Sequence, residues 1–600
     1  MSFDRSPISQ VDLPGISIGL NGLILLVGPN SSGKTSLLRD IHAVASGAER
    51  KLVVADRIAF RQPLASIDNY LTSFLNSGDI ERINQPGQPV QYRKRGHQLG
   101  TPGGGAPGTT FTSPDLQNWY ERTPQHVSSS HGKTMPGNMF LQQLGVLECS
   151  ALFIEHRLLL TQTPGTFDTH NAPPATAVQA LRLNPRARDL LTQEILRIFQ
   201  RGLWLDISGG GTLPLRVSDT ASVPTIDEMT DPQKMKNYPT IEMEGEGIRS
   251  YVAICITLLL AQRPLCLIDE PEMCLHPPQA RAIGNFIGRY GATPNGATVV
   301  ATHSSEVLRG VLQTNPQARV IRLTRREGSF HGQQVDAETL KQATARPFSR
   351  SEVILDGLFT EGVVLCESEG DRVVYESTLQ TLEPPQPDVR FIPVGGVGGF
   401  KAPIGLYQAL GVPVAVVGDL DFLFKPELAK VLEVLGAVPE DVSQLSGRSA
   451  KLRQDIMAIK PELLPDAAIE ELRPLLSDPR NWDTPQKEAS LKTQLNKVVG
   501  KLNRLSALKS KGIDGAPVDL RKEVDDLVGG LKRFGLFLVP RGELESWVPN
   551  LLVEASKENK PIWATEAARK IEEHGQGTND IWDFVKDIVA FIRSRLATTR

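Results

Sequence analysis

A short apolar run that ends in a glycine-rich loop constrains this chain more than any other segment. Residues Gly22–Gly28 read GLILLVG, the loop continues as PNSSGKT, and a helical pattern of apolar residues follows from Lys34. This strand, loop and helix fit the GxxxxGK[ST] pattern in the context that a phosphate-binding loop requires. Backbone N–H groups in such a loop surround phosphate oxygens. The expected cofactor-binding residues are Asn30, Ser31, Ser32, Gly33, Lys34, Thr35 and Ser36.

Two later strands end in residues that complete a nucleotide site. The run Leu265–Ile268 leads directly into Asp269 and Glu270, and the strand Thr298–Thr302 leads into His303. Lys34 is expected to reach the β- and γ-phosphates, and Thr35 and Asp269 are expected to hold Mg²⁺. Glu270 is the candidate for orienting or deprotonating an attacking water, and His303 for sensing the γ-phosphate.

Composition excludes some classes of protein. Lys plus Arg number 65 and Asp plus Glu number 68, so the formal net charge is −3 and overall charge cannot drive binding to nucleic acid. The five cysteines form no CxxC pair, which argues against a disulfide framework or a structural zinc site. No apolar run is long enough to cross a bilayer, and no secretory leader is evident. A cytoplasmic protein in a reducing environment is therefore expected.

The pattern of strands and helices predicts an α/β chain with two domains. The first is expected over 1–350, with an insertion at about 70–205, and the Gly-, Pro- and Ser-rich stretch 84–138 is interpreted as a mobile loop. The second is expected over 351–600, where a new βαβαβ alternation begins, with a helical insertion at about 425–530.

Carboxylates recur at the ends of the strands predicted in the second half. Glu367 follows the strand Val363–Cys366, and Asp371 lies in the first turn of the next helix. Asp419 and Asp421 follow another strand, and Glu545 follows a third. Side chains in a DxD pair point the same way, and carboxylates that converge repel one another unless a divalent cation lies among them. The sequence therefore predicts a site for Mg²⁺ or Mn²⁺, because these cations prefer hard oxygen ligands.

The N-terminal half resembles the ATP-binding-cassette ATPases, in the branch of SMC/Rad50-like and OLD-family proteins. The resemblance rests on GPNSSGKT, on LCLIDEPEMCLHP and on THSS. The segment EGEGIRS stands where that family has an LSGGQ-like signature, which assigns Gly245 and Gly247 to ATP binding. The resemblance implies that two ATPase domains enclose ATP, each offering its signature to the other, and so a homodimer or higher oligomer. Gln62 is a candidate for the family's Q-loop residue.

The C-terminal half resembles the TOPRIM domain, a Rossmann-like fold, and carries over its acidic positions to Glu367, Asp371, Asp419 and Asp421. Ser368 departs from the usual glycine, whereas VGGVGGFK matches the family's glycine turn. An ABC-type ATPase followed by TOPRIM is the arrangement of OLD-family ATP-dependent endonucleases. The resemblance implies ATP-regulated, two-metal hydrolysis of DNA, with a basic residue after the last acid: Lys570, with Arg569 and Lys560 as alternatives.

Two further interpretations stay open at this stage. The chain could cleave RNA such as tRNA, or could be an ATP-driven sensor or scaffold that recruits a toxin or helicase partner. An anti-phage role and an operon-encoded partner are expectations from the resemblance. From Lys487 to Lys511, seven basic residues accompany a helical apolar seam, which indicates either a phosphate-contacting face or a solvated helix.

Overall fold

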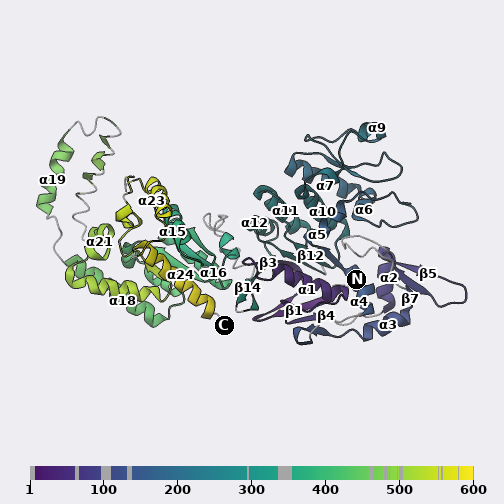
Figure 1. The fold of residues 1–600 in the computed structure, drawn as a ribbon, viewed down its shortest axis with the longest axis horizontal. Coiled ribbons are helices and arrows are strands. Elements are labelled where there is room, and N and C mark those ends of the chain that lie inside the picture. Colours follow the sequence, from purple (N-terminus) through teal and green to yellow (C-terminus); the bar gives the residue numbers. More distant parts are fainter. Residues whose placement is uncertain are drawn as a thin grey trace. The chain divides into compact units, whose positions relative to one another are not determined.

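The computed structural model consists of two compact units, Met1–Lys341 and Gln342–Arg600, each described by itself (Figure 1). The division falls close to the predicted domain boundary near residue 350. The structure describes residues 7–60, 67–95, 110–131, 138–292, 296–326, 328–335, 355–384, 386–458, 465–478, 484, 487–488, 490–492, 494–495, 498, 505–551, 553–555, 559–578 and 580–598.

A six-stranded sheet of order β15-β14-β3-β13-β12-β9 forms the centre of the first unit. All neighbouring pairs are parallel except β14 with β15. Parallel strands of this kind are covered on both faces, which is why β12, β13 and β3 are nearly continuous apolar runs. The bounds are Gly22–Val27 (β3), Cys149–Leu152 (β9), Leu265–Asp269 (β12), Ala297–Ala301 (β13), Arg319–Arg326 (β14) and Ser329–Val335 (β15).

Helices between these strands bury the apolar residues that the sequence places at helical spacing. Helix α1 (Lys34–Ser46) buries Leu37, Leu38 and Ile41 and ends where Gly47 adopts a left-handed φ of 64°. Such a glycine satisfies the last carbonyls of a helix without strain. Helices α11 (Pro277–Tyr290) and α12 (Ser305–Thr314) pack against each other, and α7 (Pro185–Phe199) contacts α10 (Glu246–Ile256).

The region predicted as an insertion differs from that expectation in one important way. Strand β9 lies within 70–205 yet pairs in parallel with β12, so it belongs to the central sheet. Parts of 84–138 are also regular structure rather than a loop, namely β6 (Gln91–Lys94), β7 (Thr110–Phe111), α3 (Ser113–Glu121) and β8 (His126–Ser128). Strand β8 joins a second sheet of order β2-β1-β4-β8, whose other strands are Ile8–Leu13 (β1), Ile16–Gly19 (β2) and Arg57–Phe60 (β4). The glycine-rich residues 100–108 lie outside the described part of the chain.

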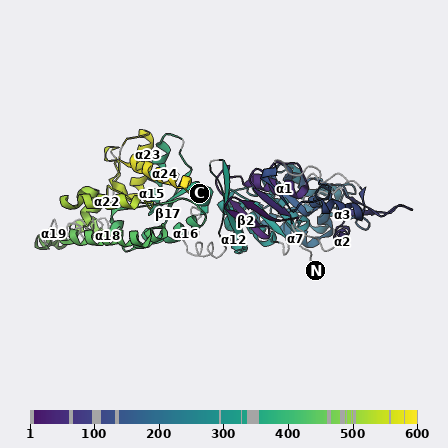
Figure 2. The same ribbon diagram turned by 90° about the horizontal axis from the view of Figure 1, so that it is seen from below.

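The second unit is built on a parallel sheet of order β17-β16-β18-β19, which agrees with the predicted βαβαβ alternation. Its strands are Gly362–Cys366 (β16), Val389–Pro393 (β17), Val414–Gly418 (β18) and Leu536–Leu538 (β19). Figures 1 and 2 both show α23 (Lys560–His574) and α24 (Ile581–Thr598) beside α15 (Glu369–Thr381), and their apolar residues form one core with this sheet.

Helices fill the predicted insertion between β18 and β19. They include α17 (Glu427–Val434), α18 (Pro439–Ala458), α19 (Pro465–Ser477), α21 (Ser506–Lys511) and α22 (Arg521–Lys532). Of the predicted basic helix, Lys509 and Lys511 lie on α21, whereas Lys497, Lys501 and Arg504 are outside the described residues.

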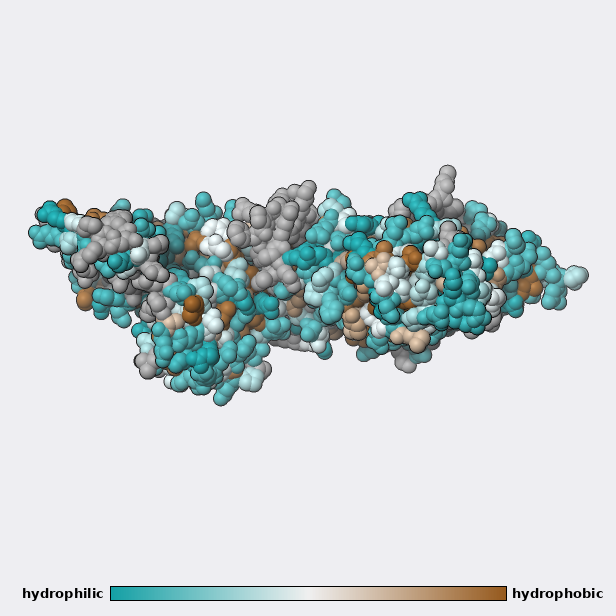
Figure 3. All heavy atoms as spheres, turned by 90° about the horizontal axis from the view of Figure 1, so that it is seen from above, coloured by the Kyte–Doolittle hydropathy of each residue, from teal (hydrophilic) through white to brown (hydrophobic). Residues whose placement is uncertain are grey.

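Hydrophilic residues predominate on the face drawn in Figure 3, with apolar side chains in small scattered groups. Within the described part of the chain, none of the helices combines the length and the apolar character needed to span a membrane.

Candidate nucleotide and metal sites

The phosphate-binding loop depends on glycines at its two ends. Gly28 has a φ of 139°, and a Cβ there would lie 2.1 Å from the Leu323 carbonyl oxygen. Gly33 has a φ of 94° and caps the start of α1, and a Cβ there would lie 2.7 Å from the Phe330 ring. Only glycine adopts such angles without strain. The loop is therefore held in the wrapped form that presents backbone amides to an anion.

Lys34 is buried at the start of α1, with 3% of its surface exposed. Its Nζ donates hydrogen bonds to the carbonyl oxygens of Gly28 (2.7 Å) and Pro29 (2.9 Å). Burial lowers the pKa of Lys34 to about 8, although the nearby carboxylates of Glu270, Glu272 and Asp269 oppose this shift. A phosphate group beside the ammonium would favour its charged form.

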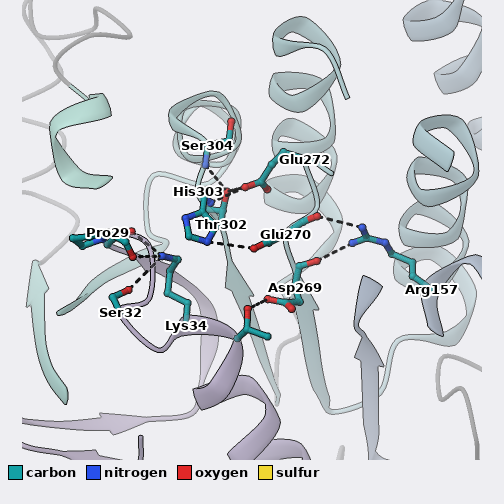
Figure 4. Close-up of polar contacts among 12 residues, drawn as sticks. Pro29, Ser32, Lys34, Arg157, Asp269, Glu270, Glu272, Thr302, His303 and Ser304 are labelled. Carbon is teal, nitrogen blue, oxygen red and sulfur yellow. Dashed lines mark hydrogen bonds and ion pairs between the residues drawn. The ribbon is translucent and has the colours of Figure 1, made fainter. Parts of the chain in front are cut away.

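A hydrogen bond of 2.9 Å joins the two predicted magnesium-holding residues, from Thr35 Oγ1 to Asp269 Oδ1 (Figure 4). Asp269 ends β12 and Thr35 begins α1, so residues 234 positions apart in sequence meet here. Burial raises the pKa of Asp269 to about 6, and the bond from Thr35 acts in the opposite direction. The geometry suits a shared cation that would restore full ionisation.

Glu270 and His303 face each other, with 3.3 Å between Oε1 and Nε2. Glu270 has a φ of 43°, a left-handed conformation that costs a non-glycine residue about 1–3 kcal/mol. Burial and the charge of Lys34 lower the pKa of His303, against the influence of Glu270, so His303 is neutral at pH 7. A neutral imidazole can donate a hydrogen bond from one nitrogen and accept one at the other.

Glu272 and Arg157 also belong to this site, and sequence reasoning did not identify them. Glu272 Oε1 accepts hydrogen bonds from Thr302 Oγ1 (2.9 Å) and from the His303 backbone N–H (2.6 Å), which fixes the histidine loop. Arg157 follows β9 and donates to the backbone carbonyls of Asp269 and Glu270. The available signal for Arg157 was the apolar run Cys149–Phe153 leading into charged residues, the same pattern as in β12.

A pocket of about 610 Å³ opens over the phosphate-binding loop. The predicted residues that line it are Ser31, Ser32, Gly33, Lys34, Thr35, Ser36 and His303. Lys51, Leu52, Val53, Arg325 and Phe330 line it as well and were not predicted. Asn30 and Asp269 are not among the lining residues, although Asp269 reaches the site through Thr35. Gln62 lies outside the described residues.

The signature-like glycines lie elsewhere in this unit. Gly245 caps α10, and no atom stands within 4 Å of where its Cβ would be. A Cβ on Gly247 would lie 2.4 Å from the carbonyl oxygen of Cys274, so close packing against the loop after β12 requires glycine there. Neither glycine lines the 610 Å³ pocket. Within one chain, these glycines are therefore separate from the pocket over the phosphate-binding loop.

The second site lies at the carboxyl ends of β16 and β18. The backbone N–H of Asp419 is 3.3 Å from Glu367 Oε1, which brings the two strand ends together. Asp371 is buried and forms a capping box at the start of α15, in which its Oδ2 accepts from the N–H and Oγ of Ser368, both at 2.8 Å. Asp371 thus caps the start of α15 in addition to its predicted role. Its capping partner is Ser368, the serine that stands where the family usually has glycine.

The carboxylates of this second site are crowded, and their pKa values are raised. Burial and the charges of Glu367, Asp371 and Asp421 raise the pKa of Asp419 to about 7. Burial is also the main cause of the raised pKa values of Glu367 and Asp371. Like charges brought together in this way favour protonation unless a cation compensates them.

Of the three basic candidates, Lys560 is the one that lines this pocket. Its Nζ lies 2.9 Å from Oε1 of Glu545, a carboxylate that is only 2% exposed. Ten residues along α23 correspond to about 15 Å, and Lys570 does not line the pocket. Lys570 and Arg569 lie instead near Glu566. All three residues lie on α23, and the packing of this helix decides which of them reaches the acids.

A pocket of about 390 Å³ collects most of these groups. It is lined by Glu367, Asp371, Asp419, Glu545 and Lys560, among others. Asp421 is outside this lining and forms an ion pair of 3.2 Å with Lys425. Within the described residues, no three His, Cys, Asp or Glu side chains are arranged so as to hold a metal ion. The donor chemistry nevertheless fits a hard cation, because Glu545 Oε2 is buried with no hydrogen-bond partner in the described part of the chain.

Comparisons with known proteins match both halves. Residues 358–421 match the TOPRIM domain of proteins like the overcoming lysogenization defect (OLD) protein, and 227–309 match an AAA domain described as a putative AbiEii toxin of a type IV toxin–antitoxin system. An OLD nuclease of Thermus scotoductus is 30% identical over 194 residues, which are 30% of this chain and 35% of that protein. The match thus spans about a third of the length of that relative.

Solved structures of SMC heads give weaker similarity. The head bound to the C-winged helix domain of ScpA is 13% identical with a TM-score of 0.30, covering 56% of this chain and 99% of that one. The head domain from Thermotoga maritima is 11% identical with a TM-score of 0.26, covering 55% and 99%.

The fold class is therefore a P-loop ATPase domain followed by a TOPRIM domain. The chain thus resembles an OLD nuclease over part of its length and combines an OLD-like TOPRIM domain with an AAA domain.

Proposed function

We propose that this protein is an ATP-regulated, divalent-metal-dependent DNA endonuclease that acts in anti-phage defence. The observation that carries the proposal is the presence of two built sites in one chain: a phosphate-binding loop joined to two acids and a histidine, and a pocket of carboxylates in an OLD-like TOPRIM domain. The defence role, and a partner encoded in the same operon, rest on the family resemblance.

At the first site, the loop amides and Lys34 bind the phosphates of ATP, for which Lys34 must exchange the carbonyls of Gly28 and Pro29 for phosphate oxygens. Thr35 and Asp269 would hold Mg²⁺. Glu270 accepts the proton of the attacking water while neutral His303 keeps its carboxylate in place at 3.3 Å. These roles support ATP hydrolysis as the reaction of the first unit.

At the second site, Glu367, Asp371, Asp419 and Glu545, which line the pocket, would hold Mg²⁺ or Mn²⁺. Asp421 would join a second such ion only by exchanging its ion pair with Lys425 for the metal. When bound, such ions lower the pKa of water and offset charge on phosphodiester oxygens. Lys560 contributes a fixed positive charge against which a phosphate oxygen can rest, and its contact with Glu545 keeps it at the pocket.

Control by ATP is proposed to act through a homodimer of the ATPase domains. Gly245 has open space around it and lies outside its own chain's pocket, which leaves the start of α10 available to the nucleotide of a second copy. ATP would then set the geometry of the dimer, and through it the access of nucleic acid to the carboxylates.

The decisive experiment incubates supercoiled plasmid with the purified chain and Mg²⁺ or Mn²⁺, with and without ATP. We expect metal-dependent cutting by the wild type and none by Asp419→Asn, because the amide keeps the shape but loses the charge that a cation requires. ATP binding should be equal in both proteins. The matched control is Asp388→Asn, which changes an acid of the same domain that does not line the pocket.

Undiminished cutting by Asp419→Asn would contradict the assignment. Cutting of tRNA but not of plasmid would replace DNA by RNA as the substrate. ATP hydrolysis without cleavage of either nucleic acid would favour a sensor or scaffold that recruits another effector.

A further inference from the structure

The buried arginine behind the acidic turn has no assigned role. Arg157 comes from α5 (Ile154–Arg157), directly after the edge strand β9, and is 1% exposed. We propose that Arg157 is the positioning residue that sets the Asp269–Glu270 turn and thereby aims both carboxylates. This inference rests on the proposed hydrolysis of ATP by the first unit.

The contacts of Arg157 are to the backbone of the turn and not to its carboxylates. Nη1 donates to the Asp269 carbonyl at 2.9 Å, and Nη2 donates to the Glu270 carbonyl at 3.2 Å (Figure 4). A guanidinium presents two parallel N–H groups in one plane and so fixes two consecutive carbonyls at once. Arg157 therefore constrains the direction of the peptide units that carry the two acids.

Glu270 shows what this constraint does. Its backbone is left-handed, with a φ of 43°, and its N–H donates to the Ala301 carbonyl at 2.8 Å. In this conformation the carbonyl of Glu270 accepts from Arg157, while its side chain reaches His303 in the loop after β13. An extended backbone at Glu270 would direct the side chain elsewhere, so the Arg157 contact selects the conformation that faces His303.

Arg157 also adds a buried positive charge behind three acids. Asp269, Glu270 and Glu272 all interact favourably with its guanidinium. Its Nε has no hydrogen-bond partner among the described residues, so the hydrogen bonds of this side chain go mainly to the turn. A residue that only filled space here would not need this pair of donors.

The test compares Arg157→Lys with the wild type in steady-state ATP hydrolysis and in equilibrium ATP binding. Lysine keeps the charge but cannot serve two carbonyls in one plane. We expect kcat to fall about 10²-fold, because a small displacement of a catalytic group has effects of this size. ATP affinity should change less than about threefold, since the hydrogen bonds that Arg157 makes in the described part of the chain go to the turn and not to the phosphate-binding loop. A crystal structure of the variant should show Glu270 out of the left-handed region and apart from His303.

Arg263→Lys is the matched control. Arg263 is also largely buried and holds Asp79 through two hydrogen bonds of 2.8 Å, away from the nucleotide site. A loss of kcat in both variants in proportion to their loss of thermal stability would overturn the proposal, as would an Arg157→Lys protein with unchanged kcat. So would a variant structure that keeps the Glu270 φ and its contact with His303.

Failure of the proposed function has a different signature. A wild-type chain that binds ATP but does not hydrolyse it would contradict the proposed reaction. The variant structure would still decide whether Arg157 sets the turn.

Discussion

The two sites of this molecule are built alike, but the negative charge of their carboxylates is offset to different degrees. Both place carboxylates at the carboxyl ends of parallel strands, where side chains of neighbouring strands converge. In the first unit, each acid has a partner within the chain: Thr35 for Asp269, His303 for Glu270, and Thr302 for Glu272. In the second unit, Ser368, Lys425 and Lys560 partner Asp371, Asp421 and Glu545, whereas Asp419 lies beside three other carboxylates. The second site thus gathers five carboxylates with two lysines, against three carboxylates with Lys34 and Arg157 in the first, so its deficit of positive charge is larger.

The acidities of two comparable aspartates express this difference. Burial raises the pKa of Asp269 to about 6, but the hydrogen bond from Thr35 limits the shift. Burial raises the pKa of Asp419 to about 7, and here three further carboxylates add to the shift. A cation from solution therefore has more to offset at Asp419 than at Asp269.

The largest expected effect is a loss of ATP binding that leaves metal binding at the carboxylate pocket unchanged. Lys34→Ala removes the buried ammonium that meets the phosphates, so ATP affinity should fall at least about 10²-fold. The rise in unfolding temperature caused by Mn²⁺ without ATP should persist, because the carboxylate pocket is untouched. Isothermal titration with ATP and thermal unfolding with Mn²⁺ measure the two effects. Loss of the Mn²⁺ effect in this variant would mean that the metal binds at the ATP site.

The next effect sharpens the charge argument within the second site. Lys560→Met removes the ammonium beside Glu545, and we expect the rate of plasmid cleavage to fall about 10²-fold. Lys570→Met alters the same helix outside the pocket and should leave the rate within about twofold of the wild type. Initial rates at saturating Mn²⁺ give both values. Equal losses in the two variants would make the helix as a whole, and not Lys560, responsible.

The last effect concerns stability rather than activity. Because the folded chain holds the Asp419 proton more tightly than the unfolded chain, wild-type stability is lost as the pH rises from about 4 through 7. Asp419→Asn carries no such charge, so its stability relative to the wild type should rise by about 4 kcal/mol between pH 4 and pH 8 without metal. Urea unfolding at the two pH values tests this. An equal stability difference between variant and wild type at both pH values would contradict the charge deficit. Added Mn²⁺ should abolish the relative gain in stability of the variant.

Much of both sites could be predicted because strand ends are visible in sequence. A buried apolar run followed by Asp269–Glu270, by His303 or by Glu367 marks a strand and the residue at its tip at the same time. Residues that act through packing gave a weaker signal. Arg157 follows a strand hidden in a stretch that resembled an insertion, and β9 is recognised as part of the central sheet only by its pairing with β12.

The choice between Lys560 and Lys570 shows a second limit of the sequence. Helical periodicity relates positions on one helix to one another, but it does not say which end lies against a sheet. That depends on the packing of α23 against α15, a contact between segments far apart in the chain. The pairing of Asp371 with Ser368 could not be predicted either, because the sequence shows an aspartate at this position whether it caps a helix or binds a metal.

The long sequence separations within each site have a consequence for the order of synthesis. The nucleotide site combines Thr35 with Asp269 and His303, all within the first unit, whereas the carboxylate pocket needs Glu545 and Lys560 near the end of the chain. Domains fold as units, the N-terminal one first, as the ribosome releases them. The nucleotide site is therefore complete before the carboxylate pocket exists, and a chain that stops early lacks the pocket altogether.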